Sequence, residues 1–360
     1  MNKPIKVFLV EDSPVALTIL QRILSSSSEV EVVGTARDGI DALTQIPLLK
    51  PDVVCTDLLM GKMDGLELTQ QLMSQFPKPI LAISDVVSVN DTQNIVQLLD
   101  AGVVDIFAKP QTGFIQDYER QKEQLINKIK ILSGVKVFAK RNQTNFQLKS
   151  IKGDRNLEQT TKELPSKNPL DYQIIAIGVS TGGPKALQQI FSNLPANFPL
   201  PIVCTQHISV GFLASLISWL NLDSKLKVKI AKLGEKPLPG IVYFAPENYH
   251  LEIDNRGKFC YSQAEPFNSH RPSATVMMQS LVEFYGNGII GILLTGMGKD
   301  GVLGMQKISS CGGFTIAQDK ASSVIFGMPQ EAIKIGAIRE VLSIEEIAPF
   351  LLRKVGYISK

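Results

Sequence analysis

The sequence lacks several features that would place a protein in a membrane or outside the cell. Its 360 residues contain no run near the roughly 18 apolar residues that span a bilayer, so we expect no membrane insertion. The amino-terminal apolar stretch is too short for a signal peptide. Cysteine is scarce, and none of the four cysteines stands in a CxxC pair or at zinc-ligand spacing. These absences predict free thiols in a reducing compartment and a cytoplasmic protein.

Positive and negative charges are nearly balanced. The 37 basic and 34 acidic side chains leave a net charge of only +3, so no strong field indicates nucleic acid or an anionic membrane as a partner. A hydrophobic content of 44% with 20% charged residues is that of an ordinary globular protein. The length predicts about two domains, each large enough for its own core.

Short apolar strands alternate with amphipathic helices in two parts of the chain, and no internal repeat relates them. Residues 1–132 predict a flavodoxin-like domain, a five-stranded doubly wound parallel sheet. Residues 133–170 lose this periodicity and, being rich in Lys, Gln, Asn, Thr and Ser, predict a linker. From 171 to 356 we expect a second, mostly parallel, doubly wound α/β domain. The expected strands are 5–10, 31–36, 53–56, 80–83, 104–107, 202–205, 228–231, 241–245 and 289–294, with another that begins at Tyr172.

Charged residues of the first domain follow its expected strands. Glu11 and Asp12 close the first strand, Asp57 the third and Lys109 the fifth. The carboxyl ends of parallel strands lie at one edge of a sheet, and carboxylates crowded there suit a hard divalent cation such as Mg2+. Each such residue alone is more often a solvated loop residue, but together they favour a phosphate switch. Asp57 would then form an acyl phosphate, with Lys109 and the Ser84 hydroxyl stabilising the added charge.

A glycine-rich turn in the second domain offers a nucleophile. Ser180 lies in Gly178-Val-Ser-Thr-Gly182, between an expected strand and a helix, where backbone N–H groups can also bind an oxyanion. Alone this pattern is a weak signal, since glycine-serine turns more often cap helices or bind phosphate. His207 and Asp300 follow two further strands, so the three side chains would meet at one sheet edge as nucleophile, base and orienting acid. Their order along the chain differs from that of α/β-hydrolases and disfavours that fold.

The first domain resembles a two-component receiver domain over residues 5–130. The motifs that carry this resemblance are Val-Glu11-Asp12-Ser, Thr-Asp57-Leu-Leu-Met-Gly-Lys-Met-Asp64-Gly65, Ile-Ser84 and Ala-Lys109-Pro110. The resemblance implies phosphorylation of Asp57 by a partner histidine kinase. Two positions depart from the usual pattern, with Gly61 in place of a proline and Ile106 in place of an aromatic residue. They leave open how phosphorylation is propagated.

Residues 172–352 resemble the catalytic domain of the chemotaxis receptor methylesterase (CheB) family. The motifs that carry this resemblance are Gly178-Val-Ser180-Thr-Gly-Gly-Pro, Gln206-His207-Ile, Ala245-Pro246-Glu-Asn-Tyr-His250-Leu, His270-Arg-Pro-Ser273, Leu-Leu-Thr295-Gly-Met297-Gly-Lys-Asp300-Gly301, Ala317-Gln-Asp319 and Phe326-Gly-Met-Pro329. The family hydrolyses glutamyl methyl esters on chemoreceptor cytoplasmic helices, releases methanol and often deamidates receptor glutamines. The resemblance implies that Ser180 is the nucleophile, His207 the base and Asp300 the orienting acid, with Thr181 and Met297 near the acyl oxygen and no cofactor for the esterase reaction.

The resemblance further implies that the unphosphorylated receiver covers the active site and that phosphorylation of Asp57 weakens this cover. The main alternative is a phosphorylation-controlled receptor-docking protein without esterase activity. A nucleotide-binding protein is disfavoured because the Gly182-Gly183 turn belongs to no full GxGxxG or Walker motif. A DNA-binding regulator is disfavoured because the second half is too long, too neutral and too strongly βα-patterned. We interpret His250 and His270 as packing or substrate-contact residues.

Overall fold

The computed structural model describes residues 3–85, 92–110, 115–137 and 172–357. Most of the expected linker lies outside the described residues. The domain boundaries at 132/133 and 170/171 therefore stay predictions. Within the described part of the chain, no helix is both long enough and apolar enough to cross a bilayer.

The amino-terminal domain is a five-stranded parallel sheet, as predicted, and its strand order is β2-β1-β3-β4-β5. Its strands are β1 Ile5–Val10, β2 Val30–Ala36, β3 Val53–Thr56, β4 Ile80–Ser84 and β5 Asp105–Ala108. Its helices are α1 Pro14–Ser25, α2 Gly39–Leu49, α3 Gly65–Gln75, α4 Thr92–Ala101 and α5 Ile115–Ser133. Residues at the helix starts explain several boundaries: Ser13, Asp38 and Asp64 each accept a hydrogen bond from a backbone N–H in the first helical turn.

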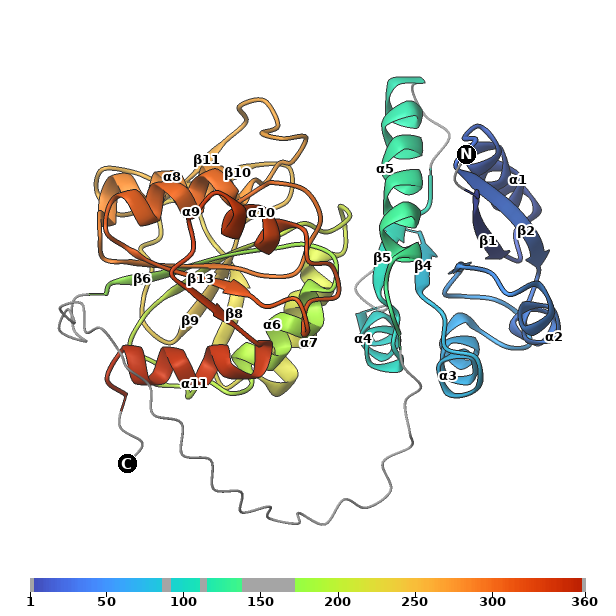
Figure 1. Cartoon of the computed structure of the whole chain (residues 1–360), viewed down its shortest axis with the longest axis horizontal. Helices are drawn as coiled ribbons and strands as arrows, with labels where there is room; N and C mark the ends of the chain where they lie inside the picture. Colours follow the sequence, from blue (N-terminus) through green and yellow to red (C-terminus); the bar gives the residue numbers. More distant parts are fainter. Residues whose placement is uncertain (1–2, 86–91, 111–114, 138–171, 358–360) are drawn as a thin grey trace, which may run out of the picture.

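The carboxy-terminal domain is a seven-stranded, entirely parallel sheet with the order β14-β13-β12-β6-β7-β9-β8. Its strands are β6 Ile174–Val179, β7 Ile202–Gln206, β8 Lys227–Ile230, β9 Ile241–Phe244, β12 Ile289–Leu293, β13 Phe314–Gln318 and β14 Glu340–Leu342. Its helices are α6 Gly183–Phe191, α7 Leu213–Asp223, α8 Ala274–Tyr285, α9 Val302–Ser310, α10 Met328–Lys334 and α11 Ile344–Lys354. Helices α8, α9 and α10 cover one face of this sheet, and α6, α7 and α11 cover the other (Figure 1).

An antiparallel hairpin outside the sheet was not expected from the sequence. It consists of β10, His250–Ile253, and β11, Phe259–Ser262. Each strand has only four residues, which is too short for alternation to stand out from a loop. The hairpin packs on α8 through Ser280, whose hydroxyl accepts a hydrogen bond from the backbone N–H of Ile253 at 2.8 Å. It therefore supports the segment that leads into α8.

The strand order of the larger sheet reverses direction next to its first strand. From β6 the chain builds β7, β8 and β9 on one side and then crosses to build β12, β13 and β14 on the other. The reversal lies between β6 and β12, and ligands of open α/β sheets bind outside the carboxyl ends of strands at such a reversal. The loops that carry Ser180 and Asp300 leave these two strands.

The two domains lie side by side, with α4, β5 and α5 on the side that faces the carboxy-terminal domain (Figure 1). Helix α4 packs against α7, and one apolar cluster includes both Leu99 of α4 and Leu216 of α7. At the margin of this contact the Lys185 ammonium pairs with the Asp100 carboxylate at 2.6 Å. The contact thus covers the region next to the β6–α6 turn.

Candidate active site

Strand register places the candidate nucleophile and base side by side. Gly178 of β6 is the Cα partner of both Thr205 in β7 and Leu293 in β12. Ser180 and His207 each lie two residues beyond this row, and neighbouring strands are about 4.8 Å apart. The backbone pairing continues past the strands, since the His207 N–H donates to the Val179 carbonyl at 3.0 Å. The predicted meeting of Ser180 and His207 at one sheet edge therefore follows from the register.

Asp300 is a fully buried carboxylate at the centre of the site. It accepts hydrogen bonds from His207 Nε2 at 2.8 Å, Ser273 Oγ at 2.6 Å, and the backbone N–H groups of Ala274 at 2.7 Å and Thr275 at 3.0 Å. Burial alone would raise the pKa of Asp300, but the hydrogen bond and charge of His207 and the donors of Ser273 and Thr275 outweigh it and hold this pKa well below its ordinary value. Asp300 is therefore an ionised acceptor at the amino terminus of α8.

These partners determine which nitrogen of His207 carries the proton. A carboxylate only accepts hydrogen bonds, so Nε2, which faces Asp300, is the protonated nitrogen of the neutral ring. His207 Nδ1 is buried and has no hydrogen-bond partner among the described residues. Nδ1 is therefore the basic nitrogen. Ser180 Oγ likewise has no hydrogen-bond partner in the described part of the chain, as is common where a nucleophile–base bond tightens only with substrate.

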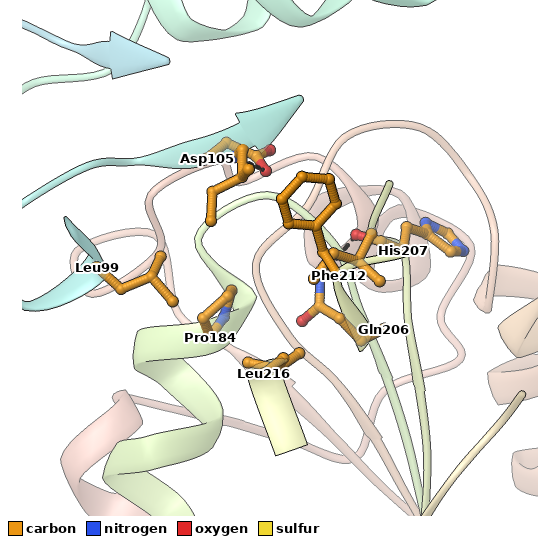
Figure 2. A pocket seen from close by; sticks show the side chains of 9 residues that line it. Leu99, Asp105, Pro184, Gln206, His207, Phe212 and Leu216 are labelled. Atoms are coloured by element: carbon orange, nitrogen blue, oxygen red, sulfur yellow. Dashed lines mark hydrogen bonds between the residues drawn. The ribbon is translucent and has the colours of Figure 1, made fainter. Parts of the chain in front are cut away.

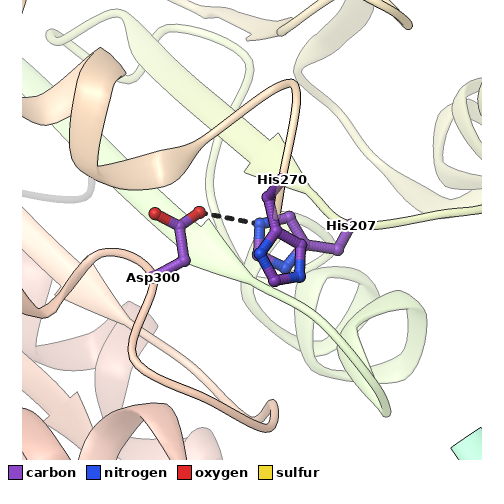
Figure 3. Close-up of side chains that lie close together, drawn as sticks. All are labelled: His207, His270 and Asp300. Atoms are coloured by element: carbon purple, nitrogen blue, oxygen red, sulfur yellow. Dashed lines mark hydrogen bonds and ion pairs between the residues drawn. The ribbon is translucent and has the colours of Figure 1, made fainter. Parts of the chain in front are cut away.

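A second imidazole lies on the first. The ring of His270 stacks on that of His207 with centroids 3.9 Å apart and an interplanar angle of 16° (Figure 3). Nitrogen and oxygen atoms of the two histidines and Asp300 lie within 4.8 Å of one another, a grouping that could suggest a metal site. Lone pairs of imidazoles lie in the ring planes, and nearly parallel planes cannot both contain an ion at the usual distance of about 2 Å. With four donors already on Asp300, this arrangement suits proton transfer better than metal binding.

His250 positions a residue that binds Asp300. It is buried, its Nδ1 accepts from the Ser273 backbone N–H at 3.2 Å, and its Nε2 lies 3.2 Å from the Glu265 carbonyl oxygen. This is the packing role that the sequence suggested, with the added effect of placing Ser273 against Asp300. Ser273 ends the His270-Arg-Pro-Ser273 motif, but no role was expected for it, although a serine before the apolar run that starts α8 is a helix-cap signal.

The residues expected near the acyl oxygen flank Ser180. Thr181 is buried, whereas the Met297 side chain is 50% exposed in the loop after β12. Among the described residues, the backbone N–H groups of Thr181 and Met297 donate no hydrogen bond, so both can serve an oxyanion. A Cβ on Gly296 would come within 2.6 Å of Ser180 Cβ, so only glycine lets the Met297 loop lie against the nucleophile.

The amino-terminal domain has an acidic cluster at its own carboxyl edge. Carboxylate oxygens of Glu11, Asp12 and Asp57 lie within 4.8 Å of one another. Lys109 Nζ lies 2.7 Å from Asp57 and 3.1 Å from Glu11. Burial raises the pKa of both Asp57 and Glu11, and the charge of Asp57 adds to the effect on Glu11. Ser84, also buried, ends β4 beside this cluster, and its carbonyl accepts from the Lys109 N–H at 2.8 Å.

The cluster has the properties of a divalent-cation site. Glu11 Oε2 is buried and without a hydrogen-bond partner in the described residues. A buried, unpaired carboxylate oxygen beside two further carboxylates is costly unless a cation joins it. Hard oxygen ligands, with Asp12 exposed so that water can complete the shell, fit Mg2+.

The domain contact reaches the candidate catalytic residues. A small cavity has Leu99, Asp105 and Ile106 on one side and Pro184, Gln206 and His207 among the residues on the other (Figure 2). The Thr181 hydroxyl donates to Asp105 Oδ2 at 3.0 Å, and the Ser209 hydroxyl donates to the Ile106 carbonyl at 3.3 Å. Nothing in the sequence indicated a role for Asp105, because this contact joins residues of two separate domains.

Comparisons with known proteins cover both domains. Residues 175–351 match the family model described as CheB methylesterase, and residues 7–114 match that of the response regulator receiver domain. A protein-glutamate methylesterase/protein-glutamine glutaminase from Syntrophus aciditrophicus is 36% identical over 357 residues, 99% of each chain. One from Carboxydothermus hydrogenoformans is 39% identical over 352 residues, 95% of this chain and 97% of that one. The crystal structure of the Thermotoga maritima CheB methylesterase catalytic domain is 41% identical, with a TM-score of 0.50, and covers 51% of this chain and 98% of that chain.

Proposed function

Because the chain belongs to the CheB methylesterase family and carries a receiver domain, we propose that it is a phosphorylation-activated serine hydrolase of chemotaxis. Its substrates would be glutamate methyl esters on the cytoplasmic helices of chemoreceptors, and also selected receptor glutamines. The observation that carries the proposal is the ionised Asp300 bonded to His207, with Ser180 just past the end of the strand next to that of His207. This is the arrangement of an acyl-transfer site.

The reaction proceeds in two steps. Ser180 Oγ attacks the ester carbonyl carbon while its proton passes to His207 Nδ1, the nitrogen that Asp300 leaves free. The C–O bond to the methoxy group breaks, and His207 returns the proton so that methanol leaves. Water then attacks the acyl-serine, again losing its proton to His207, and the receptor glutamate and free Ser180 result. With a glutamine substrate, ammonia leaves in place of methanol.

Two parts of the site stabilise the charges that form. The negative acyl oxygen would be held by the unpaired backbone N–H groups of Thr181 and Met297. The positive imidazolium of His207 is balanced by Asp300, whose lowered pKa keeps it ionised. Donors of this kind contribute about 2.7–4 kcal/mol each to transition-state stabilisation in serine hydrolases.

The receiver domain would control access to this site. Glu11, Asp12 and Asp57 would hold Mg2+, which supplies positive charge to the phosphoryl oxygens. An Asp57 carboxylate oxygen would form the new O–P bond as the P–N bond to the phosphohistidine of a partner kinase breaks. Lys109, already 2.7 Å from Asp57, would then neutralise part of the added charge.

The route from the phosphorylation site to the active site is short. Lys109 directly follows β5, and β5 carries both Asp105 and Ile106, which contact Thr181 and Ser209 of the catalytic domain. A change in the partners of Lys109 would therefore shift the strand that covers the nucleophile, without the aromatic residue that usually stands in place of Ile106. A shift of a few kcal/mol is enough to change the covered fraction strongly.

Methanol release from methylated receptor membranes tests the function. In the presence of a small phosphodonor, the wild-type protein should release methanol, and Ser180→Ala should reduce the rate at least about 10³-fold. Ser218→Ala is the matched control, because Ser218 lies exposed on α7 and bonds only the Ala214 carbonyl. Equal rates for wild type and Ser180→Ala would reject the esterase mechanism and favour a receptor-docking protein without esterase activity. Such a docking protein, like the enzyme, would meet its receptors and kinase in the cytoplasm.

A further inference from the structure

The His270 ring lies flat on the proposed general base but makes no hydrogen bond to it. The centroids are 3.9 Å apart and the planes differ by 16° (Figure 3). A single bond from Nε2 to Asp300 determines where one nitrogen of His207 lies, but it leaves the ring free to turn about that bond. A flat neighbour on one face removes this freedom, because any rotation would drive the two rings into each other.

The backbone that presents His270 is built as a tight turn. Phe267 and His270 exchange two backbone hydrogen bonds, at 3.1 and 3.0 Å. The two residues between them, Asn268 and Ser269, both have left-handed backbones, with φ of 49° and 65°. Residues other than glycine adopt this conformation at a cost, so the surrounding structure must hold it, as is typical of functional sites. The turn lays the half-buried imidazole against the ring of His207.

Burial, against the effect of its hydrogen bond to Asn268, keeps His270 uncharged at neutral pH. Its Nδ1 lies 2.6 Å from the Asn268 carbonyl oxygen, which only accepts, so the proton of the neutral ring is on Nδ1. The titratable groups that face it are His207 and Asp300. Burial and the positive charge of His207 lower the pKa of His270 to about 4, against the opposing effect of Asp300. At neutral pH the ring is therefore a neutral, flat surface.

From this geometry we propose that His270 is a positioning residue of the esterase reaction, which holds the plane of His207 between Asp300 and Ser180. The inference rests on the proposed function, since it assigns His270 a part in that same reaction. As His207 takes the serine proton it becomes a cation, and a neutral aromatic face favours a cation where a second charged imidazole would repel it. His270 itself exchanges no proton and acts only through His207.

Two substitutions separate the flat ring from its titratable nitrogens. His270→Phe keeps a flat ring on His207, whereas His270→Ala removes it. Because misplacing a catalytic group by about 1 Å can cost about 10²-fold, we expect His270→Ala to lower kcat by about 10²-fold with KM nearly unchanged. His270→Phe should keep kcat within a few-fold of wild type. Thermal unfolding reports whether each variant is folded, and His270→Gln replaces His270→Ala if the latter is not.

A second measurement separates this inference from the proposed function. The rate at which a fluorophosphonate labels Ser180 reports activation of the serine by His207 and needs no receptor substrate. His270→Ala should slow labelling about as much as kcat, and His270→Phe should restore it. If the wild-type protein is labelled but releases no methanol, the proposed substrate is wrong. The labelling rates of the variants then still test the role of His270. The positioning role would be overturned if His270→Ala were labelled at a rate within threefold of wild type. It would also be overturned if His270→Phe lost as much labelling rate as His270→Ala, or if the substitutions changed only KM.

Discussion

Replacing Asp300 with asparagine changes the hydrogen-bonding capacity of this side chain without changing its shape. The carboxylate accepts four hydrogen bonds, with His207 and Ala274 on Oδ2 and Ser273 and Thr275 on Oδ1. Asparagine offers one oxygen and one NH2 group. Whichever way the amide is turned, its NH2 faces a backbone N–H, of Ala274 or of Thr275, that then has no acceptor.

The size of the effect follows from these contacts. Each unpaired buried donor costs about 1–3 kcal/mol, so Asp300→Asn should lower the free energy of unfolding by that amount. Both orientations remove the negative charge that balances the His207 imidazolium, and we expect at least a ~10²-fold loss of kcat. If the NH2 faces His207, Nε2 must accept and the proton moves to Nδ1, where it blocks transfer from Ser180. Reversal of the tautomer costs about 10⁴-fold in serine proteases, or about 5.5 kcal/mol.

The assay is methanol release at saturating receptor, with kcat and KM determined separately and thermal unfolding measured on the same samples. Asp254→Asn is the matched control: both donors to this carboxylate, from Arg256 and Lys258, lie on Oδ1, so an asparagine oxygen can keep them. The control should retain wild-type kcat. A loss of less than tenfold in stably folded Asp300→Asn would refute the role of Asp300 as the partner of His207.

Other perturbations test the switch and the electrostatics of the site. Asp57→Asn should abolish labelling by a phosphodonor and the accompanying rise in methanol release. Chelation of Mg2+ should abolish labelling of the wild type in the same way. Asp105→Ala removes the acceptor of the Thr181 hydroxyl. Because a hydrogen bond to a charged group contributes about 1.5–3 kcal/mol, the basal rate of methanol release without phosphodonor should rise about tenfold or more. An unchanged basal rate would contradict the proposed covering of the active site by the receiver. His270 takes up a proton near pH 6.5 in the unfolded chain but only near pH 4 in the folded protein. The free energy of unfolding should therefore decrease as the pH is lowered from 6.5 to 4. In urea titrations, His270→Phe should show a smaller decrease over the same pH range.

Much of the fold was predictable because strands that are buried on both faces leave a clear apolar signature. The runs at Ile5–Val10 and Val53–Thr56 were placed to the residue, and the doubly wound architecture of both domains is confirmed. Boundaries moved where the apolar run and the hydrogen-bonded ladder do not coincide. The strand expected over 104–107 is Asp105–Ala108, because pairing with β4 continues to Ser84.

The parts of the site that escaped prediction are those made between segments without a shared pattern. The β10–β11 hairpin, the turn that aims His270 and the Ser273 donor to Asp300 all lie in short segments between β9 and α8. Sequence suggested only packing or substrate contact for His270, whereas the stack on His207 depends on how the turn is folded. The catalytic roles of Ser180, His207 and Asp300 stay predictions for the assays above.

The sequence alone determined which side chains stand at strand ends, since apolar runs and the residues that terminate them are local, and parallel strands send their carboxyl ends to one edge. It thus placed Ser180, His207 and Asp57 at the correct edges of their sheets. Only the tertiary structure decided which nitrogen of His207 faces Asp300, which ring covers that imidazole, and that Asp105 of the other domain bonds Thr181. These properties depend on distances and donor directions between segments far apart in the chain, and no local pattern of residue types encodes such directions.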